Sequence, residues 1–150
     1  MDAFEMLKND HAKVSSLFEK LEPASDAPTR EKLFAQLKQE LDVHTHIEET
    51  ILYPALKEAS ETRDITMEAY EEHAEVKELL AEMETTPTDS EEWDDLLTEL
   101  KENVEHHVEE EESEMFKKAR TVLSEQQISD LGTRMQAEKQ QQLKTATASN

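Results

Sequence analysis

Apolar side chains recur every three to four residues along most of the chain, which is the spacing of one face of an α-helix. Prolines and small polar residues interrupt this pattern, with Thr29 as an expected helix cap and a cap at Asp89 or Ser90. Pro54 falls inside the second helical stretch and is expected to kink it. The pattern predicts four long helices, over about residues 2–21, 30–59, 65–84 and 91–122. Short connections, including a turn at 60–64, predict an all-α, up-down-up-down four-helix bundle.

A fifth, short C-terminal helix is expected after the bundle. It begins near Ser124 and places Ile128, Leu131 and Met135 on one face, which predicts that it packs on the bundle. From about Gln140 the chain is polar with small side chains, which predicts fraying. We therefore expect a four-helix bundle and two appended parts, with boundaries at 1–122 (bundle), 123–139 (helix) and 140–150 (flexible tail).

Each predicted long helix carries one histidine on its apolar face. The second and fourth helices add a glutamate one turn after that histidine, because residues four apart share a helix face. His46 and His106 fall beside or opposite the apolar face. The candidate metal ligands are therefore His11, His44, Glu48, His73, His107 and Glu111.

A single histidine on an apolar face is more often a hydrogen-bonded core residue than a ligand. A buried ionised carboxylate is different, because it costs several kcal/mol unless a charge compensates it. Two carboxylates converging with four imidazoles therefore predict a pair of divalent or trivalent cations. Iron, manganese and zinc all suit such ligands.

An internal repeat links the two halves of the chain. The pattern H-x-x-x-E-E occurs at residues 44–49 and again at 107–112, and an aromatic residue follows each, at Tyr53 and Phe116. The repeat indicates two copies of one helical hairpin, so the predicted site has two related parts.

Composition excludes several classes of function. The formal net charge of −21 argues against binding nucleic acid or an anionic membrane surface. The chain has no cysteine, and therefore no thiolate ligand or thiol nucleophile. It shows neither a bilayer-spanning apolar run nor a signal peptide, so we expect a cytoplasmic protein. No feature identifies a protein partner.

At these residues the sequence resembles the hemerythrin-like, or HHE cation-binding, family. Its members carry a histidine on the first helix, H-x-x-x-E on the second, histidine on the third, and histidine with a carboxylate on the fourth. The resemblance covers about residues 1–119, and residues 123–135 are similar to the family's short fifth helix. It implies an oxo- or hydroxo-bridged centre of two iron ions, with zinc or manganese as alternatives. His11 and His44 would then bind one iron, His73 and His107 the other, and Glu48 and Glu111 would bridge them.

The sequence departs from the oxygen-carrying members at Lys77, where they have a second histidine on the third helix. A protonated lysine is no ligand, so water or a carboxylate would fill that position. Lys77 is expected at the surface, or leaning inward as a donor to a metal-bound anion. The bridge from the fourth helix is either Glu111 or Glu112, because Glu112 has the spacing of the oxygen carriers. The Glu-x-x-His motif of ferritin-like bundles is absent.

Four functions are compatible with such a site. The first is binding of O2, NO or a related small ligand, in sensing or in oxidative or nitrosative stress. The second is an enzyme that decomposes peroxide or reduces another small oxidant at an under-ligated centre, since substrate needs an open metal position. The third is an iron-buffering or iron-sensing module, and the fourth is a metal-free structural bundle.

Overall fold

The computed structural model describes residues 1–148, with side chains described through residue 145, and every regular element in this range is helical. Two short π-helical segments continue α2 and α5 into α3 and α6, so that the chain forms four long rods and one further helix. In chain order the elements are α1 (Ala3–Leu21), α2 (Ala27–Ile47), η1 (Glu48–Leu52), α3 (Tyr53–Lys57), α4 (Ser60–Glu84), α5 (Glu91–Glu110), η2 (Glu111–Met115), α6 (Phe116–Val122) and α7 (Glu125–Ala148).

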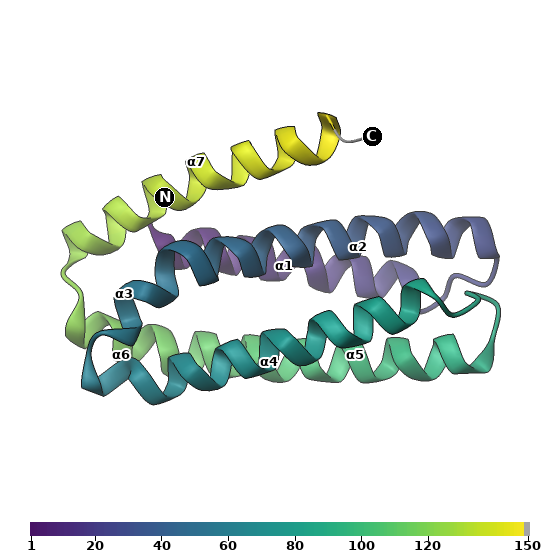
Figure 1. Ribbon diagram of the computed structural model, residues 1–150, viewed down its shortest axis with the longest axis horizontal. Helices are drawn as coiled ribbons and strands as arrows, with labels where there is room; N and C mark the ends of the chain where they lie inside the picture. The colour runs from purple at the N-terminus through teal and green to yellow at the C-terminus, as the bar shows by residue number, and fades with distance from the viewer. Residues whose placement is uncertain (149–150) are drawn as a thin grey trace.

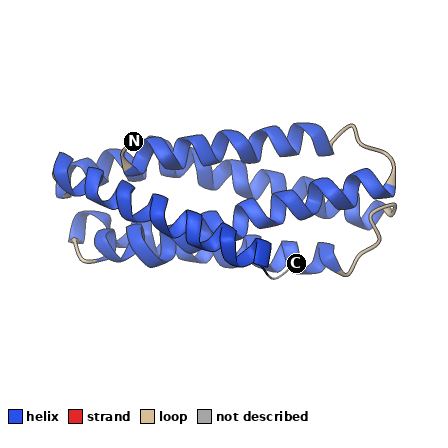
Figure 2. Ribbon diagram, turned by 90° about the horizontal axis from the view of Figure 1, so that it is seen from above, coloured by secondary structure: helices blue, strands red, loops and turns tan. Residues whose placement is uncertain are grey.

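The four rods form the predicted up-down-up-down bundle. α1 pairs with α2 and α4 pairs with α5, and the two hairpins stack on one another (Figure 1). The connections are short and lie at the ends of the bundle (Figure 2). The additional helix α7 lies along the outside of α1 and α2 and contacts both. No helix in residues 1–148 has an apolar stretch long enough to cross a lipid bilayer.

Two helix starts differ from the sequence prediction. α2 begins at Ala27 because the Asp26 side chain accepts a hydrogen bond from the Thr29 backbone N–H, at 2.9 Å, and Pro28 fits the first turn. Thr29 is therefore not the cap. The expected turn at 60–64 is also wrong. Ala59 is extended and α4 begins at Ser60, so the turn is shorter and lies earlier in the chain.

The C-terminal helix extends beyond the boundary that we expected. We expected a flexible tail from Gln140, but α7 continues to Ala148, and residues 149–150 lie outside the described part of the chain. The residues past Gln140 are mainly glutamine, leucine, lysine and alanine, which favour helix. Leu143 also packs against the core, which extends the contact of α7 with the bundle.

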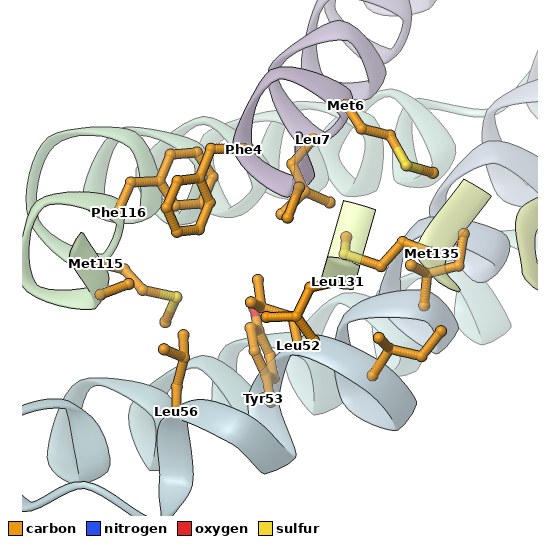
Figure 3. Close-up of a cluster of buried hydrophobic side chains, with 14 of the residues drawn as sticks. Phe4, Met6, Leu7, Leu52, Tyr53, Leu56, Met115, Phe116, Leu131 and Met135 are labelled. Atoms are coloured by element: carbon orange, nitrogen blue, oxygen red, sulfur yellow. The ribbon is translucent and has the colours of Figure 1, made fainter. Parts of the chain in front are cut away.

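The core consists of two apolar clusters at opposite ends of the bundle. One lies beside α7 and includes Phe4, which stacks on Phe116 with ring centroids 4.5 Å apart; Leu131 and Met135 of α7 reach into it (Figure 3). The other lies toward the loops that follow α1 and α4, around the buried Trp93. Between the two clusters every long rod presents a polar residue, and this polar layer is where the predicted site lies.

Candidate metal centre

The structure brings all six predicted ligand residues together in the polar layer. Each is at most 7% exposed. The histidines come from four different helices, and both glutamates lie at the start of a π-helical segment. The six side chains are His11, His44, Glu48, His73, His107 and Glu111.

The six residues form two overlapping sets of donor atoms. One set is His11, His44, Glu48 and Glu111; the other is Glu48, His73 and His107, and within each set the donor atoms lie within 4.8 Å of one another. Oε1 of Glu48 lies 3.2 Å from Nε2 of His44 and 3.1 Å from Nε2 of His73. The two oxygens of Glu111 lie 3.1 Å from Nε2 of His11 and 3.2 Å from Nε2 of His107. Each carboxylate therefore reaches from one histidine pair to the other.

The π-helical segments position these two carboxylates. Glu48 and Glu111 are the first residues of η1 and η2, and π-helical turns inside α-helices are frequent at functional sites. We expected Pro54 to kink the second rod. The irregular turn lies directly before Pro54, where a proline disrupts helical hydrogen bonding, but an equal segment occurs in the other half, where Lys117 stands at the corresponding place. Proline is therefore not needed for this geometry.

Four further carboxylates hold the outer nitrogens of the four inner histidines. The Nδ1 atoms lie 2.6 to 3.1 Å from a carboxylate oxygen of a different helix. The pairs close a ring around the bundle, because each rod supports the histidine of the next. They are Asp10 with His44, Glu49 with His73, Glu72 with His107, and Glu112 with His11.

This ring fixes which way the imidazoles present their lone pairs. A neutral histidine that donates its Nδ1–H to a carboxylate has its lone pair on Nε2, here aimed inward. The Nε2 atoms of His73 and His107 are only 3.2 Å apart, so two lone pairs would face each other. Within the described residues, five inward-facing buried atoms also have no hydrogen-bond partner: Nε2 of His11 and of His44, both oxygens of Glu48, and Oε1 of Glu111. This electron-rich donor set fits metal ions.

Without a metal, protons would have to compensate this negative charge. Burial alone would lower the pKa of His44, but the charge of Glu48 and the hydrogen bond with Asp10 raise it to about 10. Burial opposes the ionisation of Glu48 as well, but the charge of His44 keeps the pKa of Glu48 well below its usual value. Protons and metal ions therefore compete for one site.

Tyr53 is a member of the site that the sequence analysis noted only as part of the repeat. Its buried hydroxyl donates to Oε2 of Glu111 at 2.7 Å and lies 3.2 Å from Nε2 of His73 and 3.4 Å from Nε2 of His107. Burial, together with the charges of Glu111 and Glu48, raises the pKa of Tyr53 well above its usual value. The equivalent residue of the other half, Phe116, has no hydroxyl.

The side-chain positions of Glu111, Glu112 and Lys77 bear on two questions that the sequence left open. Glu111 points into the site, whereas Glu112 lies behind it on Nδ1 of His11. The Lys77 side chain is 51% exposed, as expected of a surface residue, and its Nζ lies 3.4 Å from Oε2 of Glu49. His46 lies outside the site, where it pairs with Glu138 of α7.

The supporting carboxylates Asp10, Glu49 and Glu72 were missed by the sequence analysis. A signal was present, because each of the four supporting residues is the direct sequence neighbour of an inward-facing residue. A step of one residue turns 100° around a helix, so such a neighbour faces the adjacent helix.

A small cavity adjoins all four imidazole rings. Its volume is about 20 Å³, which is close to the space that one water molecule needs. Apart from Thr45, its other walls are aliphatic: Val14, Leu41, Val76, Val104 and Val108.

Comparisons with known proteins agree with this arrangement. The chain is similar to the crystal structure of a hemerythrin HHE cation-binding domain-containing protein from Mycobacterium kansasii. The TM-score is 0.88 at 29% sequence identity, and the match covers 99% of this chain and 91% of that one.

Sequence relatives include an uncharacterised protein of Mycobacterium tuberculosis, 32% identical over an alignment of 143 residues; the match covers 91% of this chain and 84% of that protein. A DNA nickase of Nostoc sp. is 32% identical over 139 residues, which are 93% of this chain but 39% of the nickase. This chain thus spans about two fifths of the nickase's length. The sequence matches the hemerythrin HHE cation-binding domain over residues 2–119. The chain therefore belongs to the hemerythrin HHE cation-binding domain family.

Proposed function

We propose that this chain holds two iron ions in the polar layer and binds a small ligand such as O2 or NO beside them. The observation that carries the proposal is the pair of donor sets sharing Glu48, with buried donor atoms that no described residue satisfies. His11 and His44 would hold one ion, and His73 and His107 the other. Glu48 and Glu111 would bridge the two ions.

The surroundings of the site suit a small ligand. A bound iron pair would supply redox chemistry and open coordination positions. The cavity beside the histidines has room for a ligand of about the size of water, and its largely aliphatic wall favours apolar diatomic molecules over charged ones. Tyr53 offers a hydroxyl in the half of the site where Lys77 replaces a histidine, so it can donate a hydrogen bond there or serve as an oxygen ligand.

Metal analysis of the chain purified without added metal tests this proposal. We expect two irons per chain and the charge-transfer absorption of an oxygen-bridged iron pair, with a spectrum that changes reversibly on adding and removing O2 or NO. Zinc, a single ion or no metal would contradict the di-iron proposal. A di-iron spectrum that neither O2 nor NO changes would contradict ligand binding alone.

Peroxide decomposition is the second candidate, and one observation favours it. The His73 and His107 pair has no third imidazole, since Lys77 stays at the surface, so coordination positions are open to substrate. The reaction would convert two H2O2 into two H2O and one O2, which balances without another reactant. Oxygen release from H2O2 should then vanish in Glu48→Ala and exceed that of an equal concentration of free iron salt. Turnover equal to the free salt would rule it out.

The DNA-nicking activity named for the Nostoc relative is not proposed for this chain. That protein is more than twice as long as the matched region, and the net charge of −21 disfavours an approach to a nucleic acid. We therefore propose no nuclease activity for this chain.

A further inference from the structure

We propose that Lys139 of the C-terminal helix is a positioning residue of the metal centre, acting through Asp10 on His44. The proposal rests on the proposed function, because it assumes that His44 is a ligand. Nζ of Lys139 lies 2.6 Å from Oδ1 of Asp10, and Oδ2 of Asp10 lies 3.1 Å from Nδ1 of His44. A cation from α7 is thus two contacts away from the imidazole of a predicted metal-binding histidine.

Asp10 depends on this lysine more than the other supporting carboxylates depend on their neighbours. Its side chain is 3% exposed, whereas those of Glu72, Glu49 and Glu112 are 17%, 24% and 35% exposed. Water can solvate the three more exposed carboxylates. A buried carboxylate needs a nearby cation, and breaking such a pair strands its charge. Lys139 supplies that cation, with a side chain that is itself only 12% exposed.

The docking of α7 places the lysine accurately. Leu131 and Met135 are buried in the core (Figure 3), and Glu138 bonds His46 of α2 at 2.9 Å. Gly132 allows a close approach to the N-terminus, because a Cβ there would lie 2.7 Å from the backbone nitrogen of Ala3. Leu143, one turn after Lys139, also packs against the core, so the helix is held on both sides of Lys139 and is not free to rotate away from Asp10.

The family match ends at residue 119, before α7 begins at Glu125. The contact with Asp10 is therefore a contribution from outside the matched domain. With Lys139 in place, both oxygens of Asp10 are engaged and the His44 ring is held with Nε2 inward. Without it, the Asp10 carboxylate is left buried and uncompensated, and the ring loses its fixed support. The His11 and His44 side of the centre should weaken selectively.

Co2+ is a suitable probe, because its visible spectrum reports on coordination and it accepts the same ligands. The experiment titrates metal-free protein with Co2+ and compares Lys139→Met with wild type. Lys139→Arg is the conservative variant. Lys144→Met is the matched control, since Lys144 lies on the same helix and is exposed. A His44→Ala titration gives the spectrum of the chain with that side of the site damaged.

We expect wild type and Lys144→Met to bind two Co2+ alike. Lys139→Met should bind one of the two about tenfold more weakly, which is the lower end of the effect of losing an outer partner of a metal ligand. Its spectrum at one equivalent should match that of His44→Ala, and Lys139→Arg should restore part of the affinity. Lys139→Gln repeats the test if Lys139→Met does not fold.

Equal affinity of both Co2+ ions in wild type and Lys139→Met would overturn the proposal, even if the variant melted at a lower temperature. Equal weakening of both ions would overturn it as well, because that is general loosening of the fold. A wild-type chain that binds no Co2+ and no iron would overturn the proposed function together with it. Selective weakening that Lys144→Met reproduces would show that the charge of α7, not the contact with Asp10, is responsible.

Discussion

The two histidine pairs lie against the same two buried glutamates, Glu48 and Glu111, but have different surroundings. On the side of α1 and α2, Asp10 is buried and Lys139 closes the site from outside. On the side of α4 and α5, the cation nearest the supporting carboxylates is the half-exposed Lys77, at 3.4 Å from Glu49. That side also holds the Tyr53 hydroxyl, whose counterpart in the repeat is a phenylalanine.

The difference indicates that the repeat supplies the ligand set twice, while the helices around it make the halves unequal. On one side the carboxylate that supports His44 is buried and paired with Lys139. The side of His73 and His107 has one imidazole fewer than in the oxygen carriers, and the Tyr53 hydroxyl lies within reach of both histidines. We infer that the first side holds its ion firmly and that the second is where a small ligand would bind.

Replacing Glu48, which belongs to both donor sets, should damage both halves of the site at once and so have the largest effect. Glu48→Ala takes an oxygen from each set and leaves His44 and His73 without their shared carboxylate. We expect bound metal to fall from two ions per chain to fewer than one, as measured by elemental analysis after dialysis.

Glu102→Ala is the matched control for Glu48→Ala, because Glu102 is exposed on α5 and should keep both ions. Retention of two ions by Glu48→Ala would show that the carboxylate is not shared between metals.

Helical periodicity was enough to find the four inner histidines and two inner glutamates, though not Tyr53, because whether a side chain lies on the apolar face depends only on its own helix. The supporting carboxylates could not be assigned that way, since each holds a histidine of a different helix. The contact between Asp10 and Lys139 spans 129 residues, so it depends on how α7 docks. The shape of the turns at Glu48 and Glu111 was missed as well. No local sequence rule distinguishes a π-helical turn from an α-helical one here, and Pro54 marks only one of the two turns, because Lys117 stands at the equivalent place in the second half.

The metal-free protein should lose stability as the pH rises from about 6.5 to about 10. The pKa of His44 is raised from 6.5 to about 10 in the folded chain, and that of His73 is raised as well. A raised histidine pKa stabilises the fold fully below the unfolded value, and this contribution is lost as the pH approaches the folded value. We expect a loss on the order of a few kcal/mol, seen as a falling Tm of chelator-treated protein.

Bound metal should remove most of this dependence of Tm on pH, because the metal replaces the protons. His44→Ala should flatten it in the metal-free chain more than His46→Ala, which alters a more exposed histidine outside the site. A Tm independent of pH across this range would contradict proton occupancy of the site.

Tyr53→Phe should make the two halves more alike, because it copies Phe116 into the first repeat. The buried Glu111 then loses a donor at 2.7 Å, which should cost the metal-free fold about 1–2 kcal/mol. Both ions should still bind, since no histidine or carboxylate is removed, but the spectrum of the ion held by His73 and His107 should change. Tyr70→Phe is the control, because that hydroxyl lies outside the site and only reaches the Glu49 carbonyl at 3.4 Å. An unchanged spectrum in Tyr53→Phe would mean that the hydroxyl does not sense the metal.

Lys77→Met should have the smallest effect and is the sharpest counterpart to Lys139→Met. Both lysines stand behind a supporting carboxylate, but Lys77 is half exposed and its contact with Glu49 is long. Exposed ion pairs contribute about 0–1 kcal/mol, and water can take over the solvation of Glu49. We expect less than a twofold change in the affinity for either Co2+ ion and a change in unfolding free energy within about 0.5 kcal/mol. A tenfold loss in Lys77→Met would mean that burial of the carboxylate does not decide which lysine matters, and the asymmetry between the two halves would then have to come from Tyr53 alone.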